Sequence, residues 1–226
     1  LNRNVVSLDP KRTSDGDHLD SQIEEVTAWL ADCQAEDGHW AFELEADVTI
    51  PSEYIMLNHF LDEIDDPVEA KLANYIRSIQ GSHGGWPLYH GGDFDMSASV
   101  KAYFALKLAG EDTEAPHMAW ARHAILERGG AVKSNVFTRI ALALFGQLPW
   151  RSVPVIRVEA MLLPKWMPFF HIDKVSYWSR TVMVPLLVLA ALKPRARNPR
   201  GIDIAELCVR PPDRERNFLT KPTGRL

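Results

Sequence analysis

The chain has 226 residues, of which 46% are hydrophobic and 24% are charged; this excludes a disordered or fibrous protein and allows one large domain or two small ones. Its net charge of −5 argues against general nucleic-acid binding. Two cysteines, Cys33 and Cys208, are too few for a disulfide framework or a zinc site. We therefore expect a protein on the cytoplasmic side that binds neither nucleic acid nor metal.

The two ends of the chain carry no folding signal. Residues 1–4 lack an initiator Met and an apolar signal core, and residues 220–226 lack a helix pattern or a cap. We therefore expect a piece of a longer protein. The polar stretch at 1–19 is interpreted as an N-terminal tail, and residues 20–226 as a truncated helical domain.

Apolar residues at three- and four-residue steps predict helices along most of this domain. The first helix is expected to begin at Asp20 or Ser21, which can cap it, and its apolar stripe ends at Cys33. Pro67 lies at a favourable first-turn position of a later helix. The further helices are expected near 52–64, 67–79, 96–109, 115–128 and 135–146.

The most apolar segment runs from Val182 to Leu192 and is interrupted by Pro185. A membrane-spanning helix needs roughly 20 apolar residues, so this segment is too short and is predicted to be a buried helix. No segment alternates apolar and polar residues over the length of a strand, so strands are absent or minor. We expect an all-α domain with at least six helices arranged as hairpins.

An internal repeat links two parts of the chain. The two copies are Trp29-Leu30-x3-Gln34-x3-Gly38-x-Trp40 and, 46 residues further on at every position, Tyr75-Ile76-x3-Gln80-x3-Gly84-x-Trp86. A weaker echo begins at Trp120. Such a period indicates an array of helical hairpins. Closed into a ring, the array forms an α/α barrel (toroid), although an open solenoid would repeat in the same way.

The residue types that the two copies share suit a structural role. Glycine tolerates a positive φ at a helix end, tryptophan covers that end with a large apolar area, and glutamine satisfies free backbone groups at a neighbouring helix end. We therefore expect Trp40 and Trp86 to occupy equivalent places at the periphery of the barrel, packed on helix ends and away from a central cavity.

These repeats resemble the QW motifs of the squalene–hopene and oxidosqualene cyclases. Four longer segments are similar to the N-terminal third of a bacterial squalene–hopene cyclase: 34–54, 84–92, 136–150 and 167–194. The resemblance covers about residues 20–220 in order. It implies that the chain is an incomplete part of a two-barrel enzyme, in which two α/α barrels enclose a large apolar cavity.

The resemblance also implies an activity. The family converts squalene to the triterpenes hopene and hopanol by a carbocation cascade. It requires no metal or organic cofactor, and its members are homodimeric peripheral membrane proteins. The cascade starts at an Asp of a DxDD motif, because only a strong, already protonated carboxylic acid can protonate an alkene.

That acid motif is absent, since the chain contains no Asp-x-Asp-Asp. Its nearest approximations, Glu63-Ile64-Asp65-Asp66 and Asp93-Phe94-Asp95, are interpreted as a turn with a helix cap and as a loop pair. We therefore assign no catalytic residue. The missing C-terminal portion of the cyclase is expected to supply the acid, and the chain alone is expected to be inactive.

The resemblance places two aromatic residues in the substrate pocket. Trp178 in SYWSR and Phe137 in VFTR match residues that face the cavity. Aromatic faces stabilise carbocations without accepting a proton, so they do not end the cascade early. The simpler interpretation is that both side chains belong to the core, where aromatic residues at helical spacing are usually found.

The resemblance also implies a polar network. Glu53 in SEY matches a carboxylate at the far end of the cavity, where the last cation forms and is quenched. Asn135 and Lys101 stand where some relatives carry Arg and Glu, and Ala141 stands where a relative has Trp. The network is therefore altered in this chain, with Asn135 counted among the pocket residues.

Two alternatives stay open. The basic residues Lys193, Arg195, Arg197 and Arg200 form either a solvated loop or a contact with anionic lipid headgroups. The chain as a whole is either a part of a cyclase or a non-catalytic α/α toroid that binds an apolar ligand or a protein. The β subunit of protein prenyltransferases shares that architecture but needs zinc ligands, and none of the eight histidines here has ligand spacing.

Overall fold

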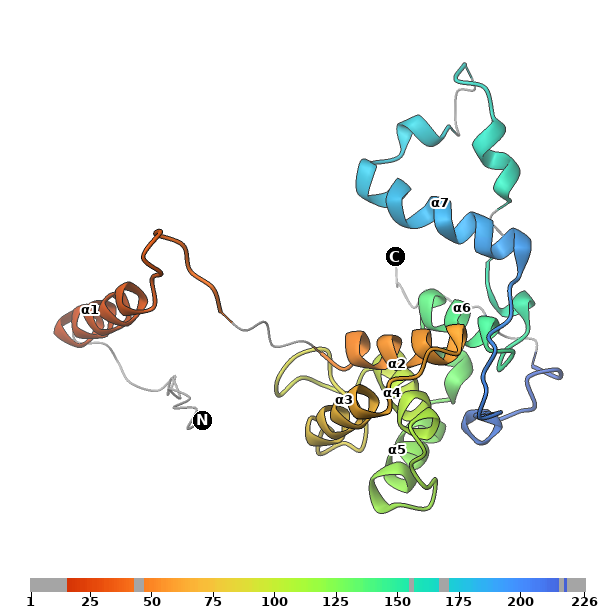
Figure 1. Cartoon of the computed structure of the whole chain (residues 1–226), viewed down its shortest axis with the longest axis horizontal. Coiled ribbons are helices and arrows are strands. Elements are labelled where there is room, and N and C mark those ends of the chain that lie inside the picture. Colours follow the sequence, from red (N-terminus) through yellow and green to blue (C-terminus); the bar gives the residue numbers. More distant parts are fainter. Residues whose placement is uncertain (1–15, 43–46, 155–156, 167–170, 216–217, 219–226) are drawn as a thin grey trace. The chain divides into compact units, whose positions relative to one another are not determined.

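The computed structural model describes residues 16–42, 47–154, 157–166, 171–215 and 218. Within these ranges the fold is all-helical, as predicted (Figure 1). Seven α-helices and five 3₁₀ helices are present in the described residues, together with one isolated bridge between Trp86 and Asp95 and no strand.

Contacts divide the chain into two compact units, Leu1–Glu45 and Ala46–Leu226. The described part of the first unit consists of α1 (Gly16–Asp32) and the turn that follows it. The helix thus begins inside the stretch interpreted as a tail. Its apolar side chains are exposed within this unit, and Trp29 stacks on Phe42 with ring centroids 5.7 Å apart.

The second unit holds the remaining helices. The α-helices are α2 (Thr49–Leu61), α3 (Asp66–Ser78), α4 (Met96–Leu108), α5 (Pro116–Glu127), α6 (Val136–Leu144) and α7 (Tyr177–Leu192). The 3₁₀ helices are η1 (Ala131–Lys133), η2 (Trp150–Ser152), η3 (Val158–Leu162), η4 (Ile172–Lys174) and η5 (Ala205–Leu207).

Two acidic residues begin helices in this unit. Asp65 accepts a hydrogen bond from the backbone N–H of Val68, at 3.1 Å, and Pro67 occupies the first turn of α3. Asp95 accepts from the N–H of Ala98, at 2.7 Å, and begins α4. Both side chains therefore satisfy donors that a helix start leaves free. The interpretation of the Asp65 segment as a turn with a helix cap is confirmed.

α4 lies at the centre of the second unit, because it is apolar on nearly every side. Eleven of its 13 residues are buried, among them Tyr103 and Phe104. It contacts α2, α3, α5 and α6, and Figure 1 shows the first three gathered around it. Phe104 meets Phe145 edge to face, with ring centroids 5.1 Å apart. These four helices are therefore arranged around α4.

The two repeat copies have the same hydrogen bonds. The indole N–H of Trp40 donates to the carbonyl of Leu30, and that of Trp86 donates to the carbonyl of Ile76, both at 2.7 Å. Each carbonyl lies in the last turn of a helix, where it has no partner within the helix. Tryptophan, rather than the predicted glutamine, thus satisfies the free helix-end group.

The glutamines instead close the turn itself. The side-chain amide of Gln34 donates to the carbonyl of Gly38, and that of Gln80 donates to the carbonyl of Gly84, both at 2.7 Å. Gly38 and Gly84 have φ of 88° and 84°, a conformation that favours glycine. In the second copy Gln80 also donates to the carbonyl of His117 at 3.0 Å, which joins the turn to α5.

A non-helical segment followed by η5, residues 194–208, crosses the ends of several helices; we call it the strap. The N–H of Asn198 donates to the carbonyl of His59 at the end of α2, at 3.1 Å. The N–H of Ala196 donates to the carbonyl of Leu144 at the end of α6, at 2.8 Å. The strap therefore caps helices that cannot satisfy these carbonyls themselves.

Arg200 is the principal ionic contact of the strap. Its guanidinium donates to Glu69 at 2.6 Å, to Asp66 at 3.0 Å and to the carbonyl of Leu108, at the end of α4, at 2.6 Å. The nearly buried carboxylate of Glu69 also contacts Nε2 of the buried His59 at 2.6 Å. Arg200 therefore compensates a carboxylate that has been withdrawn from water.

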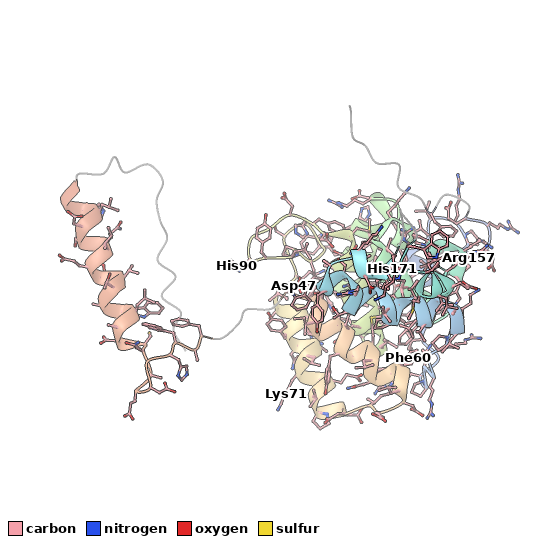
Figure 2. The ribbon with its side chains drawn as sticks, turned by 90° about the horizontal axis from the view of Figure 1, so that it is seen from above. Asp47, Phe60, Lys71, His90, Arg157 and His171 are labelled. Atoms are coloured by element: carbon pink, nitrogen blue, oxygen red, sulfur yellow. The ribbon has the colours of Figure 1, made fainter. Side chains whose placement is uncertain are left out.

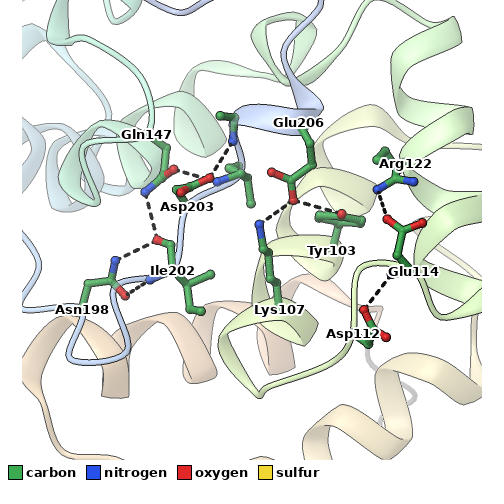
Figure 3. A network of polar contacts seen from close by, with 12 residues as sticks. Tyr103, Lys107, Asp112, Glu114, Arg122, Gln147, Asn198, Ile202, Asp203 and Glu206 are labelled. Carbon is green, nitrogen blue, oxygen red and sulfur yellow. Dashed lines mark hydrogen bonds and ion pairs between the residues drawn. The ribbon is translucent and has the colours of Figure 1, made fainter.

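A second polar cluster fixes the far end of the strap (Figure 3). One carboxylate oxygen of Glu206 accepts from Lys107 at 2.6 Å and from the Tyr103 hydroxyl at 3.1 Å. Burial, reinforced by the charge of Glu206, raises the pKa of Tyr103 well above its usual range, so the hydroxyl remains a neutral donor. The side chain of Gln147 accepts from the N–H of Ile204 at 2.9 Å and holds the strap at a further point.

The prediction that the apolar run at 182–192 forms a buried helix is wrong. α7 covers this run, but Leu187 is its one buried residue, and Leu192 is 73% exposed. The apolar run predicted a helix correctly. It predicted burial incorrectly, because one face of α7 has no partner among the described residues. No helix in the described part of the chain combines the length and apolarity needed to cross a membrane.

Candidate functional site

An apolar pocket of about 620 Å³ lies between α6 and α7 in the second unit. α6 contributes Val136, Phe137 and Ile140 to its wall. A loop around η2 contributes Trp150, Val153 and Pro154, and α7 contributes Trp178, Ser179, Val182, Met183, Leu186, Leu187 and Ala190. Ser179 is the one polar residue of this lining, so the pocket suits an apolar molecule.

Phe137 and Trp178, which are 41 positions apart in the sequence, line this same pocket. Both lie in the first turn of a helix, and their side chains are 56% and 79% exposed. The Ser176 hydroxyl accepts from the N–H of Ser179 at 3.3 Å and caps α7 at this end. The two rings therefore project from helix starts and are not part of the core.

The loop before α7 is held by charges around Asp173. Lys165 lies 3.2 Å from its carboxylate and Arg180 lies 3.7 Å away, while the N–H of Asp173 donates to Nδ1 of the buried His171 at 3.0 Å. The hydrogen bond from Lys165, with the charges of Lys165, His171 and Arg180, lowers the pKa of Asp173. These contacts orient the start of α7, where Trp178 lies.

Glu53 on α2, Lys101 on α4 and Asn135 at the start of α6 belong to a group of polar contacts between these helices. The ammonium of Lys101, buried on α4, donates to Glu53 on α2 at 2.7 Å. The backbone N–H of Asn135 donates to the hydroxyl of Ser97 at 2.8 Å, and Ser97 lies one helical turn before Lys101 on α4. The Asn135 side chain accepts from the N–H of Thr138 at 2.9 Å and caps α6.

The start of α6 connects this polar group to the apolar pocket. Asn135 caps the helix, and Phe137, two residues later, lines the pocket. Glu53 and Lys101 do not belong to the pocket lining. Ala141 is half-buried and packs against the core. Sequence reasoning thus selected two residues of the pocket and two of the adjacent polar group.

The described lining of this pocket is apolar. Among the described residues, no Asp or Glu belongs to the pocket lining. Asp65 and Asp95 cap helices, and Asp66 is paired with Arg200. The described residues contain no cluster of three or more His, Cys, Asp or Glu side chains suited to a metal ion. The chemistry available here is therefore the enclosure of an apolar molecule by aromatic and aliphatic side chains.

Sequence reasoning missed most of the pocket. Ile140 follows Phe137 by three residues, and Val182 and Leu186 follow Trp178 by four and eight, so all three lie on the same helix faces as the assigned residues. That spacing was a usable signal. Trp150, in a 3₁₀ helix, has no periodic pattern around it and could not be found in this way.

The sequence of this chain is similar to those of known proteins. A family model described as the squalene–hopene cyclase N-terminal domain matches residues 23–225. The chain is 59% identical over 213 residues to a squalene–hopene cyclase of Bradyrhizobium diazoefficiens, which covers 94% of this chain and 32% of the relative. It is 35% identical over 185 residues to one of Alicyclobacillus acidocaldarius, which covers 82% and 29%.

A fungal protein is similar as well. The squalene–hopene cyclase of Schizosaccharomyces japonicus is 53% identical over 207 residues, which covers 91% of this chain and 31% of the relative. The chain therefore spans about a third of the length of the relatives that it matches. The remaining two thirds of those proteins have no counterpart in these 226 residues.

Proposed function

Because this chain belongs to the squalene–hopene cyclase family, we propose that its apolar pocket is part of the squalene-binding cavity of a triterpene cyclase. The observation that carries the proposal is that Phe137 and Trp178, from helices distant in the sequence, line one apolar pocket. The reaction is the acid-initiated cyclisation of squalene to hopene or hopanol.

The lining suits a carbocation cascade. A squalene chain held against aliphatic side chains is kept away from water, which would quench a cation at once. The faces of Phe137 and Trp178 stabilise positive charge without accepting a proton. The wall also holds the chain in a folded conformation, which lowers the entropic cost of ring closure.

The initiating acid comes from elsewhere in the protein. No carboxyl group of the described residues lines the pocket, and no Asp-x-Asp-Asp occurs in the chain. We therefore place the acid in the C-terminal portion, for which the length of the relatives leaves ample room. By itself the chain binds substrate and does not turn it over.

The polar group around Glu53 is proposed as the far end of the cavity, where the last cation loses a proton or takes up water. The ion pair with Lys101 holds the Glu53 carboxylate in place, and the half-exposed carboxylate remains accessible on its other side. Asn135 contributes by fixing the start of α6. Substitution at either Lys101 or Asn135 is thus expected to alter the product ratio more than the rate of initiation.

The cellular setting follows from the substrate. Squalene dissolves in bilayers, so we propose a protein that associates peripherally with the cytoplasmic face of a membrane and forms a homodimer. The described pocket opens between helices with exposed apolar side chains, which supports uptake from an apolar phase. No metal or organic cofactor is needed for this chemistry.

A photoreactive squalene analogue tests the pocket directly. Supplied to the chain in neutral vesicles, it should label peptides that contain 136–140 and 178–190, and excess squalene should suppress the labelling. Trp178→Ala should reduce the labelling several-fold, whereas Trp120→Ala, outside the pocket, should leave its position unchanged. Labelling confined to α5 or to the first unit would refute the proposal. Saturable labelling with no product under any complementation would favour a non-catalytic binding module.

A further inference from the structure

We propose that a groove next to the apolar pocket binds the phosphate of an anionic phospholipid headgroup. The groove has a volume of about 550 Å³. The residues that decide its character are Trp150, Arg151, Val153, Arg157, Glu159 and Lys193. We call it the cationic groove, because three of these residues are basic and one is acidic.

Two of the three cations are free to bind an anion. Arg157 and Lys193 are exposed, and neither forms an ion pair with a described residue. Arg151 is partly engaged, because one guanidinium nitrogen donates to the carbonyl of Pro212 at 3.0 Å and the group lies over the ring of Phe218. Glu159 also lines the groove, but no described ion pair joins it to Arg157 or Lys193, so a phosphate between these two cations would displace water.

The basic cluster named from the sequence and the cationic groove have one residue in common. Arg200 was included in the basic cluster, but it is committed to Glu69 and Asp66 inside the protein. Lys193 is the one member of that cluster that lines the groove. Arg195 lines an adjoining hollow together with Lys193. Arg157, which Figure 2 labels, also lines the groove and comes from a segment that sequence reasoning had not considered.

A phospholipid fits this surface better than a soluble phosphate. The cationic groove shares Trp150, Val153 and Ala190 with the apolar pocket, so phosphate and acyl chains would meet adjacent walls. Exposed apolar residues belong to the same elements as the groove lining: Leu162 ends η3 and is 84% exposed, and Leu192 directly precedes Lys193. Cations beside exposed apolar groups are typical of a surface that enters the interfacial region of a bilayer.

Anionic lipid would thus determine how the protein meets the membrane. Each basic residue near an anionic bilayer adds attraction that salt weakens. With Arg157 and Lys193 at the headgroups, the mouth of the apolar pocket lies next to the acyl region. The inference rests on the proposed peripheral association with a membrane, but it does not require that the chain be catalytically active.

The test is binding of the chain to vesicles of phosphatidylcholine with and without one fifth phosphatidylserine, by flotation, at two salt concentrations. The parent chain should bind anionic vesicles roughly tenfold or more tightly than neutral ones. Arg157→Glu/Lys193→Glu should lose that preference, and Arg157→Gln/Lys193→Gln should lose part of it. The control Lys71→Glu/Arg210→Glu, an equal charge change at exposed residues outside the groove, should keep it. Circular dichroism establishes that each variant is folded.

Three other results of the vesicle-binding test would contradict the proposal, each in a different way. Equal binding of anionic vesicles by the parent and the groove variants would overturn the cationic groove and leave membrane association intact. Absence of binding to any vesicle would contradict both. Millimolar inorganic phosphate that abolishes vesicle binding at constant ionic strength would mean that the groove holds a free phosphate, which also overturns the lipid assignment.

Discussion

Trp86 donates its indole N–H to the carbonyl of Ile76, at 2.7 Å, and so satisfies the last turn of α3 from outside the helix. The side chain is completely buried. Trp40 makes the same contact with Leu30 in the first copy of the repeat. The motif therefore acts as a helix-end device made of one indole donor and one glycine turn.

Replacing Trp86 by Phe should test this device. Trp86→Phe keeps an aromatic ring but leaves the Ile76 carbonyl without its donor, which should cost roughly 2 kcal/mol of unfolding free energy. Trp120→Phe is the control for loss of an indole without loss of a helix-end donor, because no described hydrogen bond involves the Trp120 indole, which is 48% exposed and lies near Gly84. Urea unfolding measures both. Equal losses in the two variants would contradict the role of the indole N–H.

Alanine substitutions at Gly84 and Gly110 distinguish the cost of backbone strain from the cost of steric crowding. Both have positive φ, at 84° and 95°, so alanine at either should cost about 1 kcal/mol. A Cβ on Gly84 would lie 2.9 Å from the Trp120 ring, whereas a Cβ on Gly110 would have no heavy atom within 4 Å. Gly84→Ala should therefore lower the melting temperature clearly more than Gly110→Ala. Similar melting temperatures would mean that Trp120 moves aside freely.

Arg200 should be the most sensitive residue of the strap. Arg200→Ala leaves the nearly buried Glu69 with His59 as its remaining described side-chain partner, and we expect a loss of roughly 3 kcal/mol. Arg197→Ala is the control, because the described contact of Arg197 is made by its backbone N–H. Denaturant unfolding provides the comparison. A loss below 1 kcal/mol for Arg200→Ala would show that water replaces the guanidinium.

Cys208 should be unreactive at neutral pH. Burial, with smaller contributions from Glu206 and Glu215, raises the pKa of its thiol from 9.0 to about 11. At pH 8 roughly a thousandth of the thiol would be ionised, so a Cys33→Ser variant should react slowly with a thiol reagent until it is unfolded. Since the fold favours the neutral thiol, its stabilising contribution is complete below pH 9 and is lost as the pH rises towards 11. Fast reaction of the folded variant at pH 8 would contradict this.

Local signals in the sequence predicted local structure well. The start of α3 follows from Asp65 and Pro67, and the repeat predicted equivalent turns at Gly38 and Gly84 before any contact was known. The contact of each tryptophan with a helix carbonyl was not predicted, because an indole donor and its acceptor lie ten residues apart and no spacing rule links them.

Long-range contacts could not be predicted in this way. Arg200 and Glu69 are 131 residues apart, and nothing in the composition of either segment indicates the other. The burial of α7 was overestimated, because apolarity shows that a face needs a partner but not where the partner is. The pocket assignment of Phe137 and Trp178 came from family resemblance, whereas the spacing of Ile140 and Val182 was present and unused.

The central claim is that these residues hold squalene and that the acid lies in the rest of the protein. The most direct measurement is incubation of the purified chain with squalene, alone and together with the complementary C-terminal portion, followed by mass spectrometry for pentacyclic triterpenes. We expect no product from the chain alone, product after complementation, and a reduced or diverted product with Trp178→Ala. Turnover by the 226-residue chain alone would contradict the account, and Asp65, Asp66, Asp93 and Asp95 would then be the first residues to mutate.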